Sequence, residues 1–235
     1  MSSAPAPQSS LPAGSEQASA GIAHPTTTTH AANPSTSQDA QGGQSTTASA
    51  SAAELASTKV ALYGALRRFP DFPIKGINFI DIMPLFLDPK LQEGLLHALE
   101  LQVLLQFGGA RPDVVVGLDA RGFLFGPPLA LRLGAAFVPV RKQGKLPGPC
   151  VTAAYEKEYG ADYFQMQDGS IRSGQKVLVV DDIIATGGSA YAAGQLVKQL
   201  GGDLIGYLFI LEIPFLKGRD KLGGVPVSTL LEEAE

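Results

Sequence analysis

One segment of this 235-residue chain, residues 177–190, restricts its possible folds more than any other. Residues 177–180 form an unbroken aliphatic run, which is typical of a strand buried on both faces of a parallel sheet. Two carboxylates, Asp181 and Asp182, follow where this strand is expected to end. A turn of small residues, 185–189, comes next, and apolar residues then recur at helical spacing. The segment therefore predicts a buried strand, a tight turn and a helix in direct succession.

The small-residue turn has the features of an anion-binding site. Two adjacent glycines permit a tight turn and a close approach of the backbone to a ligand. The free N–H groups of the turn and the positive end of the following helix point into one concavity, and two hydroxyl groups add further donors. A phosphate monoester suits this arrangement. The predicted phosphate-binding residues are Ala185, Thr186, Gly187, Gly188 and Ser189.

The two carboxylates must serve a different purpose, because Asp181 and Asp182 would repel a phosphate that touched them. They suit neutral groups such as the 2- and 3-hydroxyls of a ribose, or a cation that accompanies the ligand. An ordinary strand–turn–helix connection with a solvated acidic pair is the alternative. The order of the residues favours a functional motif, and it matches neither the Walker A loop nor the dinucleotide-binding glycine pattern. We therefore predict a sugar phosphate as the ligand.

Composition narrows the classes of protein to which the chain can belong. A net charge of -4 argues against general nucleic-acid binding. No run of about 18 apolar residues is present, so we expect no membrane-spanning helix. The single cysteine, Cys150, excludes an intrachain disulfide and fits a reducing compartment. We therefore expect a cytoplasmic protein without nucleic-acid or membrane partners.

The first 55 residues differ in composition from the rest of the chain. They consist mostly of Ser, Ala, Thr, Pro, Gly and Gln, and residues 1–50 contain no Lys or Arg. Such a segment has too little apolar surface to offset the entropy that ordering it would remove. It also lacks the arginines of a mitochondrial presequence and the apolar core of a secretory signal. We predict a disordered low-complexity tail at 1–55 and one domain at 56–235.

The remaining pattern predicts an α/β domain in which several strands end at one functional edge. Apolar spacing predicts a helix at about 55–68 and others near 91–103, 129–133 and 193–200. Aliphatic runs predict strands within 77–82, 114–117, 136–140, 177–180, 204–211 and 225–231. Arg121 follows one strand, while Arg141, Lys142 and Lys145 follow the next, and ligands bind at this edge of open α/β sheets. Residues 143–163, rich in Gly and Pro, predict a mobile two-stranded excursion.

Several motifs resemble those of the adenine phosphoribosyltransferases, a group within the type I phosphoribosyltransferases. Residues 177–190 resemble the phosphoribosyl-pyrophosphate motif of the whole family. The adenine group is indicated by three further stretches: Asp119-Ala120-Arg121-Gly122-Phe123, Gly144-Lys145-Leu146-Pro147-Gly148 and Glu158-Tyr159. The resemblance covers about residues 69–231 and leaves out the N-terminal tail.

The resemblance implies a fold and a reaction. The fold would be the type I phosphoribosyltransferase fold, a central, mostly parallel sheet flanked by helices, with a small hood and a flexible flap loop. Adenine would attack 5-phospho-α-D-ribose 1-diphosphate, giving AMP and pyrophosphate in purine salvage. Mg²⁺ would travel with the diphosphate, held by substrate and water without direct protein ligands. The family also implies a homodimer.

The resemblance further assigns roles to individual residues. The ribose hydroxyls would contact Asp181 and Asp182, and the 5-phosphate would contact the small-residue turn. The Asp119–Ala120 peptide would be cis. Glu158 and Tyr159 would be catalytic, with Glu158 handling a proton of the base and the flap excluding water. The diphosphate would lie against Asp119, Ala120, Arg121, Arg141, Lys142 and Lys145, and adenine against Phe79, the backbone of Ile80, and Ile213.

The hood departs from the family pattern at two positions. Many members carry an arginine where Ile80 stands and an aliphatic residue where Asn78 stands. These departures leave the choice of base open. Two alternatives to the adenine reaction remain: a phosphoribosyltransferase for another base, such as guanine or orotate, and a non-catalytic regulator that binds phosphoribosyl pyrophosphate. The presence of Glu158 and of the flap argues against the regulator.

Overall fold

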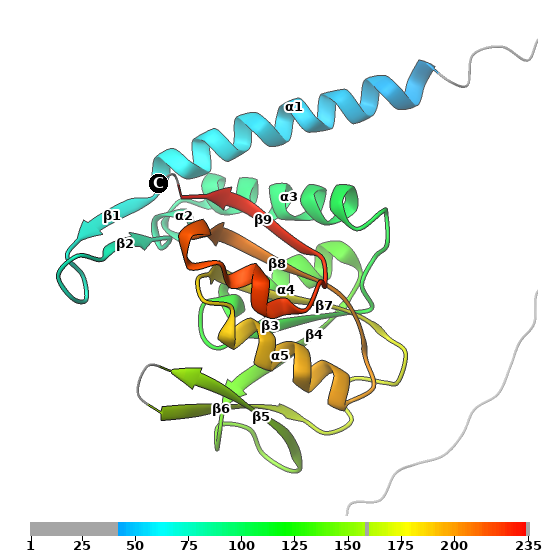
Figure 1. Ribbon diagram of the computed structural model, residues 1–235. Coiled ribbons are helices and arrows are strands. Elements are labelled where there is room, and N and C mark those ends of the chain that lie inside the picture. The colour runs from blue at the N-terminus through cyan, green and yellow to red at the C-terminus, as the bar shows by residue number, and fades with distance from the viewer. Residues whose placement is uncertain (1–41, 158–159, 234–235) are drawn as a thin grey trace, which may run out of the picture. The chain divides into compact units, whose positions relative to one another are not determined.

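The computed structural model describes residues 42–157 and 160–233, which belong to one compact unit. Its main element is a seven-stranded sheet with the order β5-β6-β4-β3-β7-β8-β9 (Figure 1). Five neighbouring strands are parallel, and the two at the β5 edge are antiparallel. The strands are β3 (Val114–Leu118), β4 (Ala136–Lys142), β5 (Cys150–Lys157), β6 (Gly160–Gln167), β7 (Lys176–Ile184), β8 (Asp203–Glu212) and β9 (Val227–Glu232). The predicted α/β fold with a mostly parallel sheet is confirmed.

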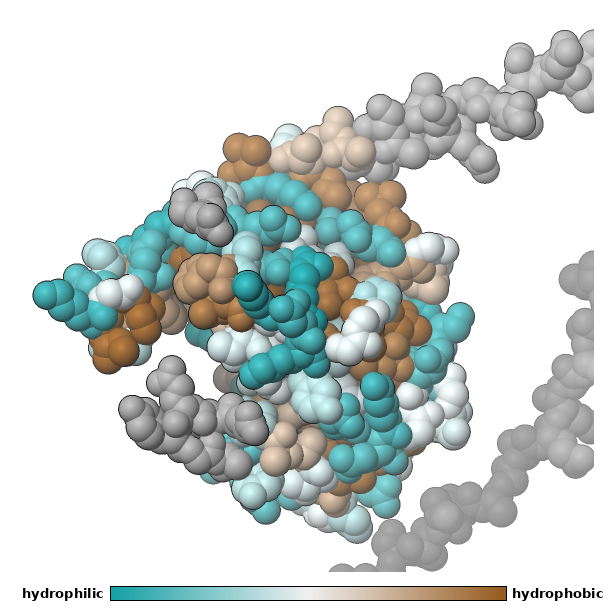
Figure 2. All heavy atoms as spheres, in the orientation of Figure 1, coloured by the Kyte–Doolittle hydropathy of each residue, from teal (hydrophilic) through white to brown (hydrophobic). Residues whose placement is uncertain are grey.

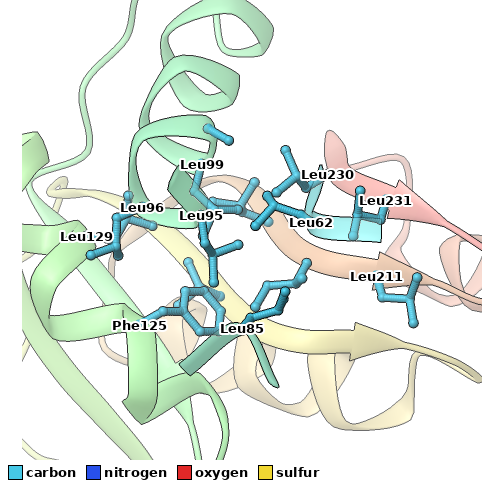
Figure 3. Packing of buried hydrophobic residues seen from close by; sticks show 14 of the residues in the cluster. Leu62, Leu85, Leu95, Leu96, Leu99, Phe125, Leu129, Leu211, Leu230 and Leu231 are labelled. Atoms are coloured by element: carbon cyan, nitrogen blue, oxygen red, sulfur yellow. The ribbon is translucent and has the colours of Figure 1, made fainter. Parts of the chain in front are cut away.

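Helices cover both faces of the sheet because its central strands are apolar on both sides. In β3, Val115 points to one core cluster while Val114 and Val116 point to the other. The first face is covered by α1 (Gly42–Ala65), α3 (Pro89–Gln106) and α4 (Gly122–Leu133), and the second by α5 (Gly188–Gln199). Figure 3 shows leucines of α1 and α3 packed against Phe125 of α4 and against β8 and β9.

The predicted hood is a separate two-stranded antiparallel sheet of β1 (Arg67–Pro70) and β2 (Asn78–Asp81). Arg67 pairs across the strands with Asp81, and its Nη2 lies 2.6 Å from Asp81 Oδ2. The connecting turn exposes Phe72, Ile74 and Ile77, and Figure 2 shows hydrophobic atoms at this tip. The prediction that a helix extends to residue 68 was wrong, because the pairing with β2 makes residues 67–70 a strand.

The N-terminal helix is longer than the apolar pattern predicted. We expected it to begin near residue 55, but α1 begins at Gly42, since no proline or glycine interrupts residues 44–63. The C-terminal half of α1 packs into the core through Leu55 and Leu62. Leu66, the residue that follows the helix, is also buried. Residues 42–55 of the predicted tail are thus helical. The predicted disorder of residues 1–41 lies outside the described residues, and the boundary at 55/56 stays a prediction.

The excursion predicted at residues 143–163 contains the antiparallel hairpin β5–β6. Its register runs from Cys150 opposite Gln167 to Lys157 opposite Gly160. The hairpin joins the main sheet because Arg141 and Lys142 of β4 pair with β6. The hairpin therefore extends the sheet at its base, and its mobility stays a prediction. Short helices complete the unit: α2 (Pro84–Leu87), η1 (Pro214–Leu216) and η2 (Gly218–Leu222).

We found no helix within the described ranges that combines the length and the apolar character needed to cross a bilayer.

Candidate active site

The candidate site lies at the carboxyl ends of β3 and β7, where two crossover connections diverge. The chain passes from β3 through α4 to β4 on one side, and from β7 through α5 to β8 on the other. Ligands of open α/β sheets bind at such points, because the diverging loops leave a crevice. Arg121, after β3, and Asp182, in β7, meet here with Nε and Oδ2 2.6 Å apart. The two predicted motifs are therefore brought together.

The two neighbouring carboxylates of β7 lie in a buried environment that disfavours their charged forms. Asp182 is buried, and Asp181 is half-buried. Burial, together with the charge of Asp182, raises the pKa of Asp181 well above its usual value. Burial also raises the pKa of Asp182, although the charge of Arg121 opposes that rise. Arg121 Nε contacts Asp182 Oδ2 without the angles of a hydrogen bond, so among the described residues this buried oxygen is held by an ion pair and has no well-aligned donor.

The predicted phosphate loop has the backbone geometry that an anion site requires. Gly187 adopts a left-handed φ of 78° and caps the N-terminus of α5. The first N–H groups of such a helix have no partner within it, and its dipole favours an anion. Thr186 is exposed and Ser189 is half-buried, and both line the same pocket. The five predicted residues thus form one concave loop.

The loop rests directly on the backbone of a later segment. A Cβ atom added to Gly187 would lie 2.2 Å from the carbonyl oxygen of Gly218. One added to Gly218 would lie 2.3 Å from the carbonyl oxygen of Ala185. No side chain fits between these two stretches, so both positions require glycine. The sequence did not predict this contact, because it joins segments that are distant along the chain.

A pocket of about 320 Å³ connects the phosphate loop with the hood. Besides the five loop residues and both aspartates, it is lined by Phe79, Ile80 and Ile213, as predicted for the base, and by Asn78 and Arg121. Phe79 is half-buried and is held edge-on by Phe72, with ring centroids 5.2 Å apart. The side chain of Ile80 lies in the hydrophobic core at 4% exposure. The Ile80 side chain is therefore committed to the core, and the predicted contact of this residue with a base would have to come from its backbone.

A second pocket of about 380 Å³ shares Arg121, both aspartates and Ser189 with the first. Its wall includes Asp119, Ala120 and Lys142, three of the residues predicted to bind the diphosphate. The Asp119–Ala120 peptide is cis, as predicted. The two pockets together make a cleft long enough to hold a sugar phosphate at one end and a second anion at the other.

Two predicted cations lie beside this second pocket and outside its lining. The Nε of Arg141 is 3.1 Å from Asp119 Oδ2, and its Nη1 donates to the carbonyl oxygen of Lys145 at 3.4 Å. Lys145 is exposed. Glu158 and Tyr159, predicted to be catalytic, lie outside the described residues, between the ends of β5 and β6.

Tyr155 and Phe164 are pocket residues that the sequence did not predict. They stack with ring centroids 4.4 Å apart and line the second pocket from the β5–β6 hairpin. The alternation of apolar and polar residues along β5 and β6 was a detectable sign that Tyr155 and Phe164 lie on the same face of the hairpin. Nothing in the sequence indicated that this face borders the cleft, because that depends on how β6 pairs with β4.

The donor set at the cleft suits a loosely held divalent cation. The described residues contain no group of three or more His, Cys, Asp or Glu that would form a protein cage for a metal. Asp119 lines the second pocket only, whereas the neighbouring carboxylates Asp181 and Asp182 line both pockets. Such a pair fits Mg²⁺ that takes most of its ligands from substrate oxygens and water.

Comparisons with known proteins agree with this geometry. Residues 93–214 match the phosphoribosyl transferase domain family. The chain is 57% identical over 181 residues to adenine phosphoribosyltransferase of Yarrowia lipolytica, an alignment that covers 77% of this chain and 99% of the relative. It is 55% identical over 167 residues to adenine phosphoribosyltransferase 1 of Saccharomyces cerevisiae, covering 71% and 89%.

Solved structures show the same similarity. The Saccharomyces cerevisiae adenine phosphoribosyltransferase, in complex with an imino-altritol bisphosphate and adenine, superposes with a TM-score of 0.73 at 54% identity, covering 75% of this chain and 99% of that one. The Trypanosoma brucei enzyme, in complex with AMP, pyrophosphate and ribose-5-phosphate, gives 0.67 at 28% identity, covering 75% and 79%. With its fold, its phosphate loop and these identities, the chain belongs to the adenine phosphoribosyltransferase family.

Proposed function

We propose that this chain transfers the 5-phosphoribosyl group from 5-phospho-α-D-ribose 1-diphosphate to adenine, giving AMP and pyrophosphate. The main support is the buried Asp182 carboxylate, which is paired with Arg121 beside the phosphate loop. A ribose hydroxyl would donate to Asp182, the loop would bind the 5-phosphate, and the Arg121 guanidinium would face the diphosphate. One cleft therefore accommodates three chemically different parts of one donor.

Charge in the second pocket explains how the donor would be activated. Departure of the diphosphate leaves positive charge on the ribose and concentrates negative charge on the leaving group. Cations and N–H groups fixed in advance around that leaving group lower the barrier. Arg121 and Lys142 line the pocket, and the cis Asp119–Ala120 peptide lies in its wall. Arg121 must leave Asp182 to reach the diphosphate, which would free that carboxylate for the ribose.

The base would enter between Phe79 and Ile213, on the hood side of the cleft. The Phe79 ring offers a stacking surface, and the backbone of Ile80 offers hydrogen-bond groups. The buried Ile80 side chain supports adenine binding that does not need an arginine at this position. Glu158 would exchange a proton with the base, and Tyr159 would help to close the site.

Mg²⁺, supplied with the diphosphate, would neutralise part of the charge on the leaving group. We also propose a homodimer and a cytoplasmic location. Leu124 and Leu131 are exposed apolar residues of α4 and support pairing with a second copy. The single cysteine supports a reducing compartment.

The decisive experiment measures pyrophosphate release by the full chain, with the sugar donor, Mg²⁺ and one base at a time. We expect AMP formation with adenine and little release with guanine, hypoxanthine or orotate. The Asp181→Asn/Asp182→Asn double variant serves as the negative control. Activity with another base alone would contradict the adenine assignment. Tight donor binding without release for any base would favour the regulatory alternative.

A second experiment tests the role of Glu158. Glu158→Ala should lower kcat by about 100-fold or more, because it removes a proton-transfer group, while the Kd of the sugar donor changes little. Glu156→Ala, in the same acidic run, is the matched control and should stay near wild-type activity. Unchanged turnover in Glu158→Ala would remove this residue from the proposed mechanism.

A further inference from the structure

The side chain of Arg219 makes four polar contacts just behind the phosphate loop. Its Nε and Nη2 donate to the two carboxylate oxygens of Glu212 at 2.7 and 2.5 Å. Its Nη2 also donates to Thr229 Oγ1 at 3.0 Å, and its Nη1 to the carbonyl oxygen of Val227 at 2.8 Å. This Arg219 clamp fastens η2 to the carboxyl end of β8 and to β9.

The clamp holds the segment on which the phosphate loop rests. Gly218, the residue before Arg219, is buried and touches the backbone of Ala185 and Gly187 closely enough to exclude any side chain. Lys217, on its other side, is exposed. Among the described residues, the side chain adjacent to Gly218 that has strong polar partners is therefore Arg219.

Glu212 links the same clamp to the base side of the cleft. It is followed by Ile213, whose N–H donates to the carbonyl oxygen of Ile184 at 3.0 Å. Ile184 precedes the phosphate loop, so Ile213 holds the residue before the loop, and Gly218 packs against Ala185 and Gly187 within it. A shift of Arg219 would be transmitted to the loop through Gly218.

The chemistry of the clamp is specific for arginine. A guanidinium can donate two parallel hydrogen bonds to a carboxylate and still have donors left for other acceptors, whereas an ammonium group cannot match this fork. The hydrogen bond from Arg219 holds the pKa of Glu212 below its usual value, so the pair stays charged at neutral pH. Glu212 is buried at 8% exposure, whereas the Arg219 side chain is 41% exposed, so water reaches the arginine side of the contact.

We infer that Arg219 is a positioning residue for the 5-phosphate: its clamp on Glu212 presses Gly218 against Ala185 and Gly187 and so fixes the loop in its binding shape. The inference rests on the proposed function, because it names a further determinant of affinity for the same donor. Arg219 is not in the lining of either pocket, so it acts on the ligand only through the loop.

Arg219→Met tests this, because it removes the donors and keeps most of the side-chain length. We expect the KM for the sugar donor and the Kd for ribose 5-phosphate to rise by about tenfold. We expect kcat and the Kd for pyrophosphate to stay within about twofold, since the diphosphate side has separate partners. Arg219→Lys should recover only part of the loss, because it lacks the fork.

Lys221→Met is the matched control, since it removes a positive charge from the same short helix. Lys221 has no ion pair within the described part of the chain. Equal donor KM values for the two methionine variants would overturn the inference. Parallel losses of ribose 5-phosphate and pyrophosphate affinity in Arg219→Met would do the same, because they would indicate general damage.

A milder variant decides the matter if Arg219→Met does not fold. Thr229→Val removes the hydroxyl that accepts from Arg219 and donates to Glu212, and it should raise the donor KM by about threefold without changing kcat. No rise would overturn the inference. Ribose 5-phosphate binding can be measured without a base, so the inference is tested even if the wild-type chain forms no AMP and the proposed function fails.

Discussion

The sugar-phosphate side of the cleft lies on the seven-stranded sheet, whereas the base side includes the separate two-stranded sheet β1–β2. On the first side, one contiguous stretch from Asp181 to Ser189 provides two carboxylates and the whole phosphate loop. On the second side, Phe79 provides a ring, while Ile80 faces the core and provides only backbone. The sugar-phosphate side is thus defined by its side chains and glycines, and the hood by its backbone path.

This difference explains how the hood could bind a base without a particular side chain at residue 80. A backbone hydrogen bond is available whatever side chain stands at the position, provided that the strand keeps its register. Ile80 occupies the core at 4% exposure and still belongs to the pocket lining.

The largest effect is expected at the phosphate loop. Gly187→Ala should lower kcat/KM for the sugar donor by about 100-fold, because the added Cβ would collide with the carbonyl oxygen of Gly218 at 2.2 Å. Gly169→Ala is the control, since that glycine has a similar φ of 71° with open space around it. If steady-state kinetics gave equal small losses for both variants, the loop would not be as rigid as its packing indicates.

The second-largest effect is expected at Asp182, the carboxylate that is paired with Arg121. Asp182→Asn should raise the KM for the sugar donor by about 30-fold, because an amide is a weaker acceptor for ribose hydroxyls than a carboxylate. The KM for adenine should stay nearly constant. Asp203→Asn, at the first residue of β8 and so at the other edge of the sheet from the cleft, controls for the loss of one charge. A larger change for adenine than for the donor would mean that the two sides of the cleft are not separate.

On the hood, Phe79→Ala should raise the KM for adenine by about tenfold through loss of stacking. The Kd of the sugar donor, measured without base, should remain at the wild-type value and serves as the internal control. A matching loss of donor affinity would show that Phe79 also supports the sugar-phosphate side.

The smallest effect on activity is expected from Ile80→Val. The variant should lower the free energy of unfolding by about 1 kcal/mol, because it removes one buried methylene. The KM for adenine should stay within about twofold of wild type, since only the backbone of residue 80 is assigned to the base. Urea unfolding and steady-state kinetics measure the two quantities, and a large rise in this KM would give the side chain a role in recognition.

The two sides also differ in how far the sequence predicted them. That residues 185–189 and the two aspartates lie in one pocket was predicted from a short contiguous motif, and the cis Asp119–Ala120 peptide was predicted from the family resemblance. The strand at residues 67–70 was missed, because Arg67 and Arg68 show no apolar alternation in the sequence. These residues become a strand only by pairing with β2. The Gly218 contact and the Arg219 clamp were also missed, because tertiary packing creates them.

The neighbouring aspartates have one more consequence, which concerns acidity. Because burial raises the pKa of both carboxyl groups in the folded protein, the folded chain holds protons that the unfolded chain has already released above about pH 4. The contribution of this pair to the free energy of unfolding therefore falls as the pH rises from the usual carboxyl range toward the raised values. At these two positions, acidification favours the folded state while it protonates the oxygens that a pentose needs, so the protonation that stabilises the pair also weakens its hold on the donor.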